Sequence, residues 1–233
     1  MKKACWEKSI LELIRRSSTS LPRDVESGLK QARQNETRSE RARWVLDRIL
    51  ENVREARIRD TPICQDTGTL TFCFRVPVGF DTNMLTAHTR KAVSRATRLG
   101  YLRQNTVDAV SGASYETNIA YGAPVLHFRQ GARKTIDVRL IMKGGGCENV
   151  GCQYSLPDAS LHAERDLQGV RKCLADAIWR AQGRGCAPGI LGVCIGADRA
   201  AGYQQAKEQF LHKVGERSKV RALAELEERV LED

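Results

Sequence analysis

Helical periodicity fills the first 60 residues of the 233-residue chain in three pieces, and this pattern limits the fold most strongly. Apolar side chains recur at helical spacing in 10–14, 25–29 and 44–53, with breaks near 17–22 and 35–39. Fewer strands follow, and they do not alternate regularly with helices. This order favours an α+β arrangement over a regular series of strand–helix–strand units.

The remaining pattern predicts a strand over 69–78, a helix over 83–102, and two more strands over 123–129 and 135–142. Further helices are predicted over 166–182, 200–212 and 220–231, and a buried strand over 190–196. We therefore expect an α+β fold in which N-terminal helices pack on a small mixed sheet with further helices. We expect residues 1–233 to form one domain.

Composition favours a globular protein, because 41% of the residues are hydrophobic and 28% are charged. No run of about 18 apolar residues occurs, and charged side chains interrupt the apolar positions of the first 20 residues. The sequence thus predicts neither a membrane span nor a secretory segment, and we expect a cytoplasmic protein.

Eight cysteines in such a chain are expected to be reduced thiols, some of them ligands, and not a disulfide framework. Cys5, Cys73 and Cys173 stand in apolar or helical contexts that are typical of small buried side chains. The other five stand beside glycines or in glycine-rich loops, where a sulfur can be presented to a ligand: Cys64, Cys147, Cys152, Cys186 and Cys194.

The net charge of +10 would attract nucleic acid, an acidic partner or an anionic substrate. Acids and bases alternate along 38–51, however, which is typical of a solvated helix face with ion pairs. The sequence has no RNA-binding signature, no zinc-finger spacing and no basic stripe interleaved with aromatic residues. We therefore expect no nucleic-acid partner.

The segment Pro62–Gly68 places a thiol, an amide and a carboxylate side by side before a glycine. Cys64 suits iron as a soft ligand, and it can also be a nucleophile or an ordinary loop thiol. Cys186 is too distant in sequence for a compact run of cluster cysteines. Asp66 can exchange protons or simply bind backbone amides of its own loop.

Two more segments suggest chemistry. Arg103 follows the predicted helix 83–102 and can grip a carboxylate, although such an arginine is commonly solvated or paired with an acid. Three consecutive glycines, Gly144 to Gly146, allow close approach of the backbone to a ligand, or form a plain turn.

From about Leu21 onward the chain resembles the iron-sulfur hydro-lyases of the class I fumarase and L-tartrate dehydratase family. Segments that carry this resemblance recur in the family's order along the chain: 62–68, Leu102-Arg103, 143–149, 153–157, 169–173, Gly185-Cys186-Ala187-Pro188 and 196–200. A set of motifs spread over this length is far more specific than a single short pattern.

The resemblance implies a [4Fe-4S] cluster held by three cysteines, with one iron open to substrate, and reversible addition or removal of water. Cys64 and Cys186 match two cluster ligands. Gln65 and Asp66 match substrate-site positions, with Asp66 as the proton-transfer group, and Arg103 matches an arginine that grips a substrate carboxylate. Backbone N–H groups at the far end of a dicarboxylate would come from Gly144, Gly145 and Gly146.

One feature departs from the family pattern, in which the third cluster cysteine follows well after the second. No cysteine follows Cys194, and the chain stops at Asp233 within an amphipathic pattern. We therefore expect the sequence to be the N-terminal, α-type region. A separate chain with the β-type region would supply the third ligand, or Cys147, Cys152 or Cys194 would substitute locally. A homo-oligomer is also expected.

Three hypotheses of function follow. The first is an α-type hydro-lyase chain that needs further polypeptide and hydrates fumarate to malate, or acts on a tartrate-like hydroxy dicarboxylate. The second is an inactive remnant of the family without a cluster. The third, a nucleic-acid or zinc-binding module, leaves Cys64, Arg103 and the three glycines unexplained.

Overall fold

The computed structural model describes residues 6–186 and 188–233, and the chain divides into two compact units. The first unit ends at Gly145 and the second runs from Gly146 to Asp233. Cys5 lies outside the described residues. The prediction of one domain stays a prediction, since the division describes compactness only.

Three helices open the first unit, as predicted: α1 (Trp6–Thr19), α2 (Arg23–Asn35) and α3 (Glu40–Arg59). The hydroxyl of Ser39 accepts a hydrogen bond from the Ala42 N–H and so caps α3. Asp60 ends that helix in a left-handed conformation, with φ +52°. Helix α4 (Thr82–Arg98) ends before the predicted residue 102, because Gly100 adopts φ +79°.

The predicted mixed sheet is confirmed, with the strand order β2-β1-β3. Its strands are β1 (Thr69–Pro77), β2 (Val125–Gly131) and β3 (Asp137–Lys143). Strand β1 pairs with β2 in parallel and with β3 in antiparallel orientation. Strands β2 and β3 begin two residues later than the pattern indicated, which does not alter the α+β class.

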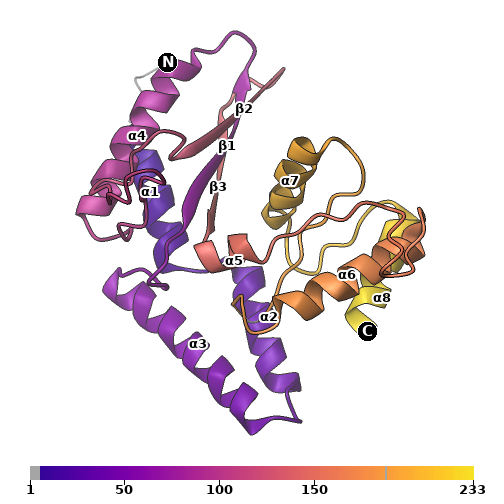
Figure 1. Ribbon diagram of the computed structural model, residues 1–233. Helices are drawn as coiled ribbons and strands as arrows, with labels where there is room; N and C mark the ends of the chain where they lie inside the picture. The colour runs from indigo at the N-terminus through magenta and orange to yellow at the C-terminus, as the bar shows by residue number, and fades with distance from the viewer. Residues whose placement is uncertain (1–5, 187) are drawn as a thin grey trace. The chain divides into compact units, whose positions relative to one another are not determined.

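Helices α1 and α4 lie side by side on one face of this sheet and enclose the main core (Figure 1). Alternate side chains of β1 point into it, and the ring of Phe72 is fully buried. Phe74 stacks on Phe128 of β2 with 5.0 Å between the ring centroids. Burying such a side chain contributes about 1.5–3 kcal/mol, so this layer is the main source of stability in the unit.

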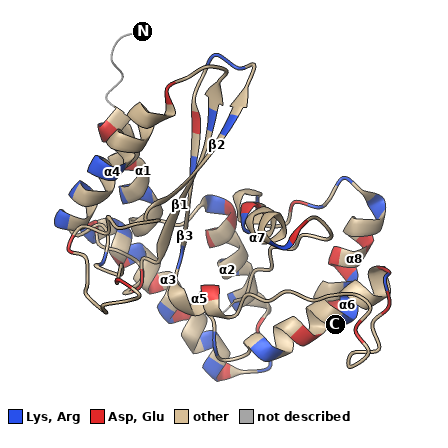
Figure 2. Ribbon diagram, turned by 45° about the horizontal axis from the view of Figure 1, so that its top comes forward, with Lys and Arg blue, Asp and Glu red and all other residues tan. Residues whose placement is uncertain are grey.

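Charges of both signs are interspersed along α2 and α3 (Figure 2). Ion pairs join them, among them Arg33 with Asp47 at 2.8 Å and Arg57 with Glu26 at 2.5 Å. The predicted ion-paired face is therefore confirmed. In the part of the chain that the structure describes, no helix combines the length and the apolar character that crossing a bilayer requires.

The second unit is built from helices, with irregular segments between them. Asp166 caps α6 (Leu167–Ala181), Asp198 caps α7 (Arg199–Glu208), and η1 (Gln209–Leu211) and α8 (Arg221–Glu232) follow. These helices were predicted to within a few residues. The short α5 (Gly145–Asn149), which begins at the last residue of the first unit, was predicted as a loop.

The predicted strand over 190–196 is wrong. Ile190, Leu191 and Ile195 are about half exposed, and no strand is assigned to this segment. A short apolar run does not by itself distinguish a buried strand from other structures. Within the described residues of the second unit no strand offers this segment a hydrogen-bonding edge.

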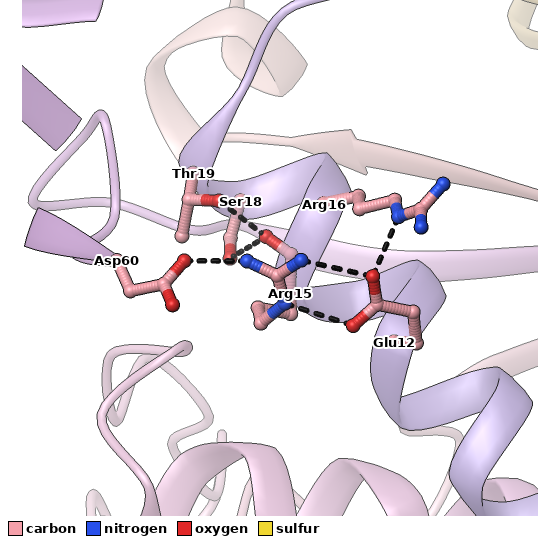
Figure 3. A network of polar contacts seen from close by, with 6 residues as sticks. All are labelled: Glu12, Arg15, Arg16, Ser18, Thr19 and Asp60. Carbon is pink, nitrogen blue, oxygen red and sulfur yellow. Dashed lines mark hydrogen bonds and ion pairs between the residues drawn. The ribbon is translucent and has the colours of Figure 1, made fainter. Parts of the chain in front are cut away.

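A polar network joins the C-terminal end of α1 to the end of α3 (Figure 3). Glu12 accepts hydrogen bonds from the guanidinium groups of Arg15 and Arg16, at 2.6–2.9 Å. Arg15 also donates to Asp60 at 2.5 Å. The backbone carbonyl of Arg15 accepts the hydroxyl of Thr19 at 2.8 Å. The network therefore fixes the start of the segment that leads from α3 to β1.

The two guanidinium groups lower the pKa of the Glu12 carboxyl from 4.5 to about 2. The folded state therefore gains stability above about pH 4.5, and loses it as the pH falls toward 2. Because the pair is partly solvated, we expect Glu12→Gln to lower the free energy of unfolding at pH 7 by only about 0.5–1 kcal/mol. Urea unfolding at several pH values measures the difference.

The difference between the wild type and Glu12→Gln should shrink between pH 4.5 and 2. The matched control is Glu225→Gln, whose ion pair with Arg221 is a single exposed contact within α8. An equal difference at pH 7 and pH 2 would contradict the role of this network.

Candidate active site

The side chain of Asp66 joins the loop before β1 to the loop after β3. Its Oδ1 accepts the N–H of Gly68 at 2.9 Å, and its Oδ2 accepts the N–H of Gly145 at 2.7 Å. These loops meet because the antiparallel pairing of β1 with β3 ends at Thr69 and Lys143. The sequence left two roles open for Asp66, proton exchange and binding of backbone amides. The structure shows the second of these contacts.

The glycines at this junction have a steric reason. A Cβ atom at Gly68 would lie 2.1 Å from the Lys143 carbonyl oxygen, and Gly68 itself has φ +68°. A Cβ atom at Gly144 would lie 2.9 Å from Asp66 Oδ2. The two loops can therefore approach this closely only with hydrogen at position 68, and a Cβ at position 144 would displace the Asp66 carboxylate.

Cys64 and Gln65 lie on the outer side of the same loop. The N–H of Asp66 donates to the Cys64 sulfur at 3.4 Å, and the thiol approaches Gln65 Oε1 at 3.6 Å. Cys64 is half-buried and Gln65 is exposed. The preceding residue, Ile63, is held by its N–H on the Ser18 carbonyl and by its carbonyl on Asn52.

Arg103 lies next to this loop. Its backbone N–H donates to the hydroxyl of Thr67 at 3.1 Å, while its side chain is exposed. Within residues 6–186 and 188–233 its guanidinium group has no ion-pair partner. The structure thus brings five predicted site residues of the first unit close together. Hydrogen bonds join Cys64, Gln65, Asp66 and Gly145, and Arg103 is tied to the same loop through Thr67.

Sequence reasoning missed the polar residues that hold this cluster together. Thr67 is buried, and its hydroxyl and N–H both donate to Asn105 Oδ1, at 3.0 and 3.3 Å. Asn118 is buried and binds the backbone of residues 103, 105 and 106. Thr67 lies within the Pro62–Gly68 motif, so the sequence pointed to its neighbourhood. Asn118 belongs to no motif, so nothing in the sequence pointed to it.

The remaining candidates lie in the second unit. Gly146 is close to the Arg184 carbonyl, since a Cβ there would lie 3.6 Å from its oxygen, so α5 lies beside the segment that leads to Cys186. Cys147 is half-buried in α5, and Cys186 is exposed. Glu148 of α5 forms an ion pair with Lys207 of α7 at 2.5 Å. Within the second unit, α5 is therefore held by its ion pair with α7.

The two other candidate cysteines differ in environment. Cys152 is exposed near Tyr154, whose phenol donates to Asp176 at 2.6 Å. Burial, that hydrogen bond and Cys152 raise the pKa of Tyr154. Cys194 is half-buried and contacts Gln205 Oε1 at 3.8 Å. By contrast Cys173 is buried, as predicted, and burial raises the pKa of its thiol, which makes it a poor ligand.

The donor chemistry of Cys64 suits an iron-sulfur cluster, because the residue is only half-buried and its sulfur accepts a backbone N–H. All seven cysteines at described positions are thiols. Among the described residues no three His, Cys, Asp or Glu side chains converge on a point that could hold a metal ion.

Comparison with known proteins gives consistent matches over nearly the whole chain. The family model for fumarate hydratase (Fumerase) matches residues 7–233. The "Putative fumarate hydratase class I" of Geobacillus stearothermophilus is 44% identical over 97% of this chain, which spans 44% of that protein. The L(+)-tartrate dehydratase subunit alpha of Escherichia coli K12 is 28% identical over 92% of this chain, which spans 70% of that subunit.

We expect Gly68→Ala to disrupt the junction of the two loops, because its Cβ meets backbone atoms that cannot move aside. Gly79→Ala is the matched control, since Gly79 has φ +75° and no atom within 4 Å of its Cβ position. Left-handed strain alone costs about 1–2 kcal/mol. Urea unfolding should show a loss for Gly68→Ala at least about 2 kcal/mol larger than for the control. Equal losses would contradict a steric requirement at Gly68.

Proposed function

Because the chain belongs to the fumarate hydratase (Fumerase) family, we propose that it is the α-type part of an iron-sulfur hydro-lyase. Its reaction is the reversible hydration of a C4 dicarboxylate, of which fumarate and water giving malate is the leading case. A tartrate-like hydroxy dicarboxylate is the second candidate substrate, supported by the similarity to a tartrate dehydratase subunit.

The observation that carries this proposal is the exposed guanidinium of Arg103, which has no acidic partner in the described part of the chain. An exposed arginine is commonly solvated, so what distinguishes Arg103 is that the fold holds both its backbone N–H and its carbonyl. Its backbone is tied to the loop of Cys64 and Asp66. An anion that reaches Arg103 therefore meets a thiol and a carboxylate nearby.

Cys64 and Cys186 would hold a [4Fe-4S] cluster, with a third ligand from a separate β-type chain or from Cys147, Cys152 or Cys194. When bound, such a cluster supplies a Lewis acid at its open iron. The β-type partner, a homo-oligomeric assembly and a cytoplasmic location belong to the same proposal.

The chain's own residues would bind and orient the substrate. Arg103 would grip one carboxylate in a bidentate contact that fixes the plane of the dicarboxylate. Asp66 would hold or release the proton, because two backbone N–H groups occupy only about two of its four lone-pair directions. Gln65 and the backbone of Gly144, Gly145 and Gly146 would contact the other polar atoms of the substrate.

Anaerobic reconstitution with iron and sulfide, with and without a β-type partner, tests the cluster. We expect a brown species with bound iron and sulfide, which Cys64→Ala abolishes by removing a ligand. Cys173→Ala is the control and should keep the colour, since Cys173 is buried in α6. A colourless protein even with the partner would favour the inactive remnant, and equal effects of both substitutions would refute the ligand assignment.

Replacement of Arg103 tests the substrate grip. We expect Arg103→Lys to weaken binding of malate about tenfold, because an ammonium group cannot make the bidentate contact. Arg98→Lys, at the exposed end of α4, is the matched control and should leave the dissociation constant unchanged. Calorimetric titration of the reconstituted protein measures both, and an unchanged affinity in Arg103→Lys would remove the arginine from the site.

A further inference from the structure

Asn118 is a buried asparagine whose side chain makes four hydrogen bonds. Its Oδ1 accepts the N–H groups of Asn105 and Thr106, both at 3.1 Å. Its Nδ2 donates to the Arg103 carbonyl at 2.6 Å and to the Thr97 hydroxyl at 3.1 Å. Asparagine has two lone pairs and two N–H donors, so its hydrogen-bonding capacity is fully used.

The backbone of Arg103 is therefore held from both sides. Its carbonyl binds Asn118, which is anchored on α4 through Thr97, and its N–H binds Thr67 of the cysteine loop. Asn105 closes the cluster, since its Oδ1 accepts both donors of Thr67. The side chain of Arg103 leaves this fixed backbone toward solvent.

We propose that Asn118 is a positioning residue that fixes the backbone from which the Arg103 side chain extends beside the Cys64–Gly68 loop, so that the guanidinium can reach a substrate carboxylate. This inference rests on the proposed function for the identity of the anion. The anchoring itself rests only on the contacts of Asn118, Thr67 and Asn105. The two parts can therefore be tested separately.

Asn118→Gly is the informative variant. Asn118 has φ +56°, a conformation that glycine adopts without strain, so this change removes the side chain and spares the backbone. Val93→Ala is the control for general destabilisation, because the Val93 side chain is fully buried on the same helix that carries Thr97. This change leaves in place the Val93 backbone carbonyl, which accepts the Thr97 hydroxyl at 2.9 Å.

The first measurement is amide hydrogen exchange in the 233-residue chain without ligand. The N–H groups of Thr67 and Arg103 report on the anchoring, because neither of them touches Asn118 directly. We expect their exchange to accelerate about tenfold in Asn118→Gly beyond any change in Val93→Ala. Equal exchange of these two amides in the two variants would overturn the proposal.

The second measurement is the dissociation constant of malate for the reconstituted protein, with a β-type partner where binding requires one. We expect Asn118→Gly to weaken binding about tenfold in the presence of Arg103, and to have no further effect in an Arg103→Ala background. An equal loss in both backgrounds would overturn the positioning role. If Arg103→Ala binds malate normally, the proposed substrate grip fails, and the exchange measurement alone decides on the anchoring.

Discussion

The antiparallel pairing of β1 with β3 is the interaction on which the candidate site depends. It ends at Thr69 and Lys143 and so places the loop before one strand against the loop after the other. Gly68 lets the two backbones approach, and Gly144 leaves room for the Asp66 carboxylate, which accepts one N–H from each loop. The strands in turn keep their register because alternate side chains of β1 are buried under α1 and α4.

Rigid backbone and exposed side chains are combined in this cluster. Cys64, Gln65 and Arg103 reach solvent to different degrees, while the groups that hold their backbones, Thr67 and Asn118, are buried. Irregular loops leave many backbone N–H and carbonyl groups without a ladder partner, and each such group costs stability if it is buried unbonded. Buried side chains that satisfy those groups allow an irregular loop to be as well defined as a strand.

The sequence predicted most of the helices and the mixed sheet. These elements are stabilised by burying side chains at regular intervals, and the spacing of apolar residues shows those intervals directly. The error over 190–196 arose where an apolar run has no sheet edge in its own unit. The site was predicted only through the family resemblance: periodicity gave no role to Arg103. The sequence did not predict a role for Asn118. Its hydrogen bonds go to backbone groups of residues 103–106, and only the folded chain brings those groups to it.

The contacts of Asp66 give this residue a structural role that does not depend on proton transfer. Each of its oxygens faces an N–H donor, so an asparagine there would turn its NH₂ group toward one of these donors. The structural role alone therefore requires a carboxylate, and finding an aspartate at this position says little about proton transfer. Arg103 carries more weight, because the fold uses both of its backbone groups and leaves its guanidinium without a partner among the described residues. A cationic side chain that extends from a fixed backbone is open to an anion, which is why the proposed substrate grip rests on Arg103.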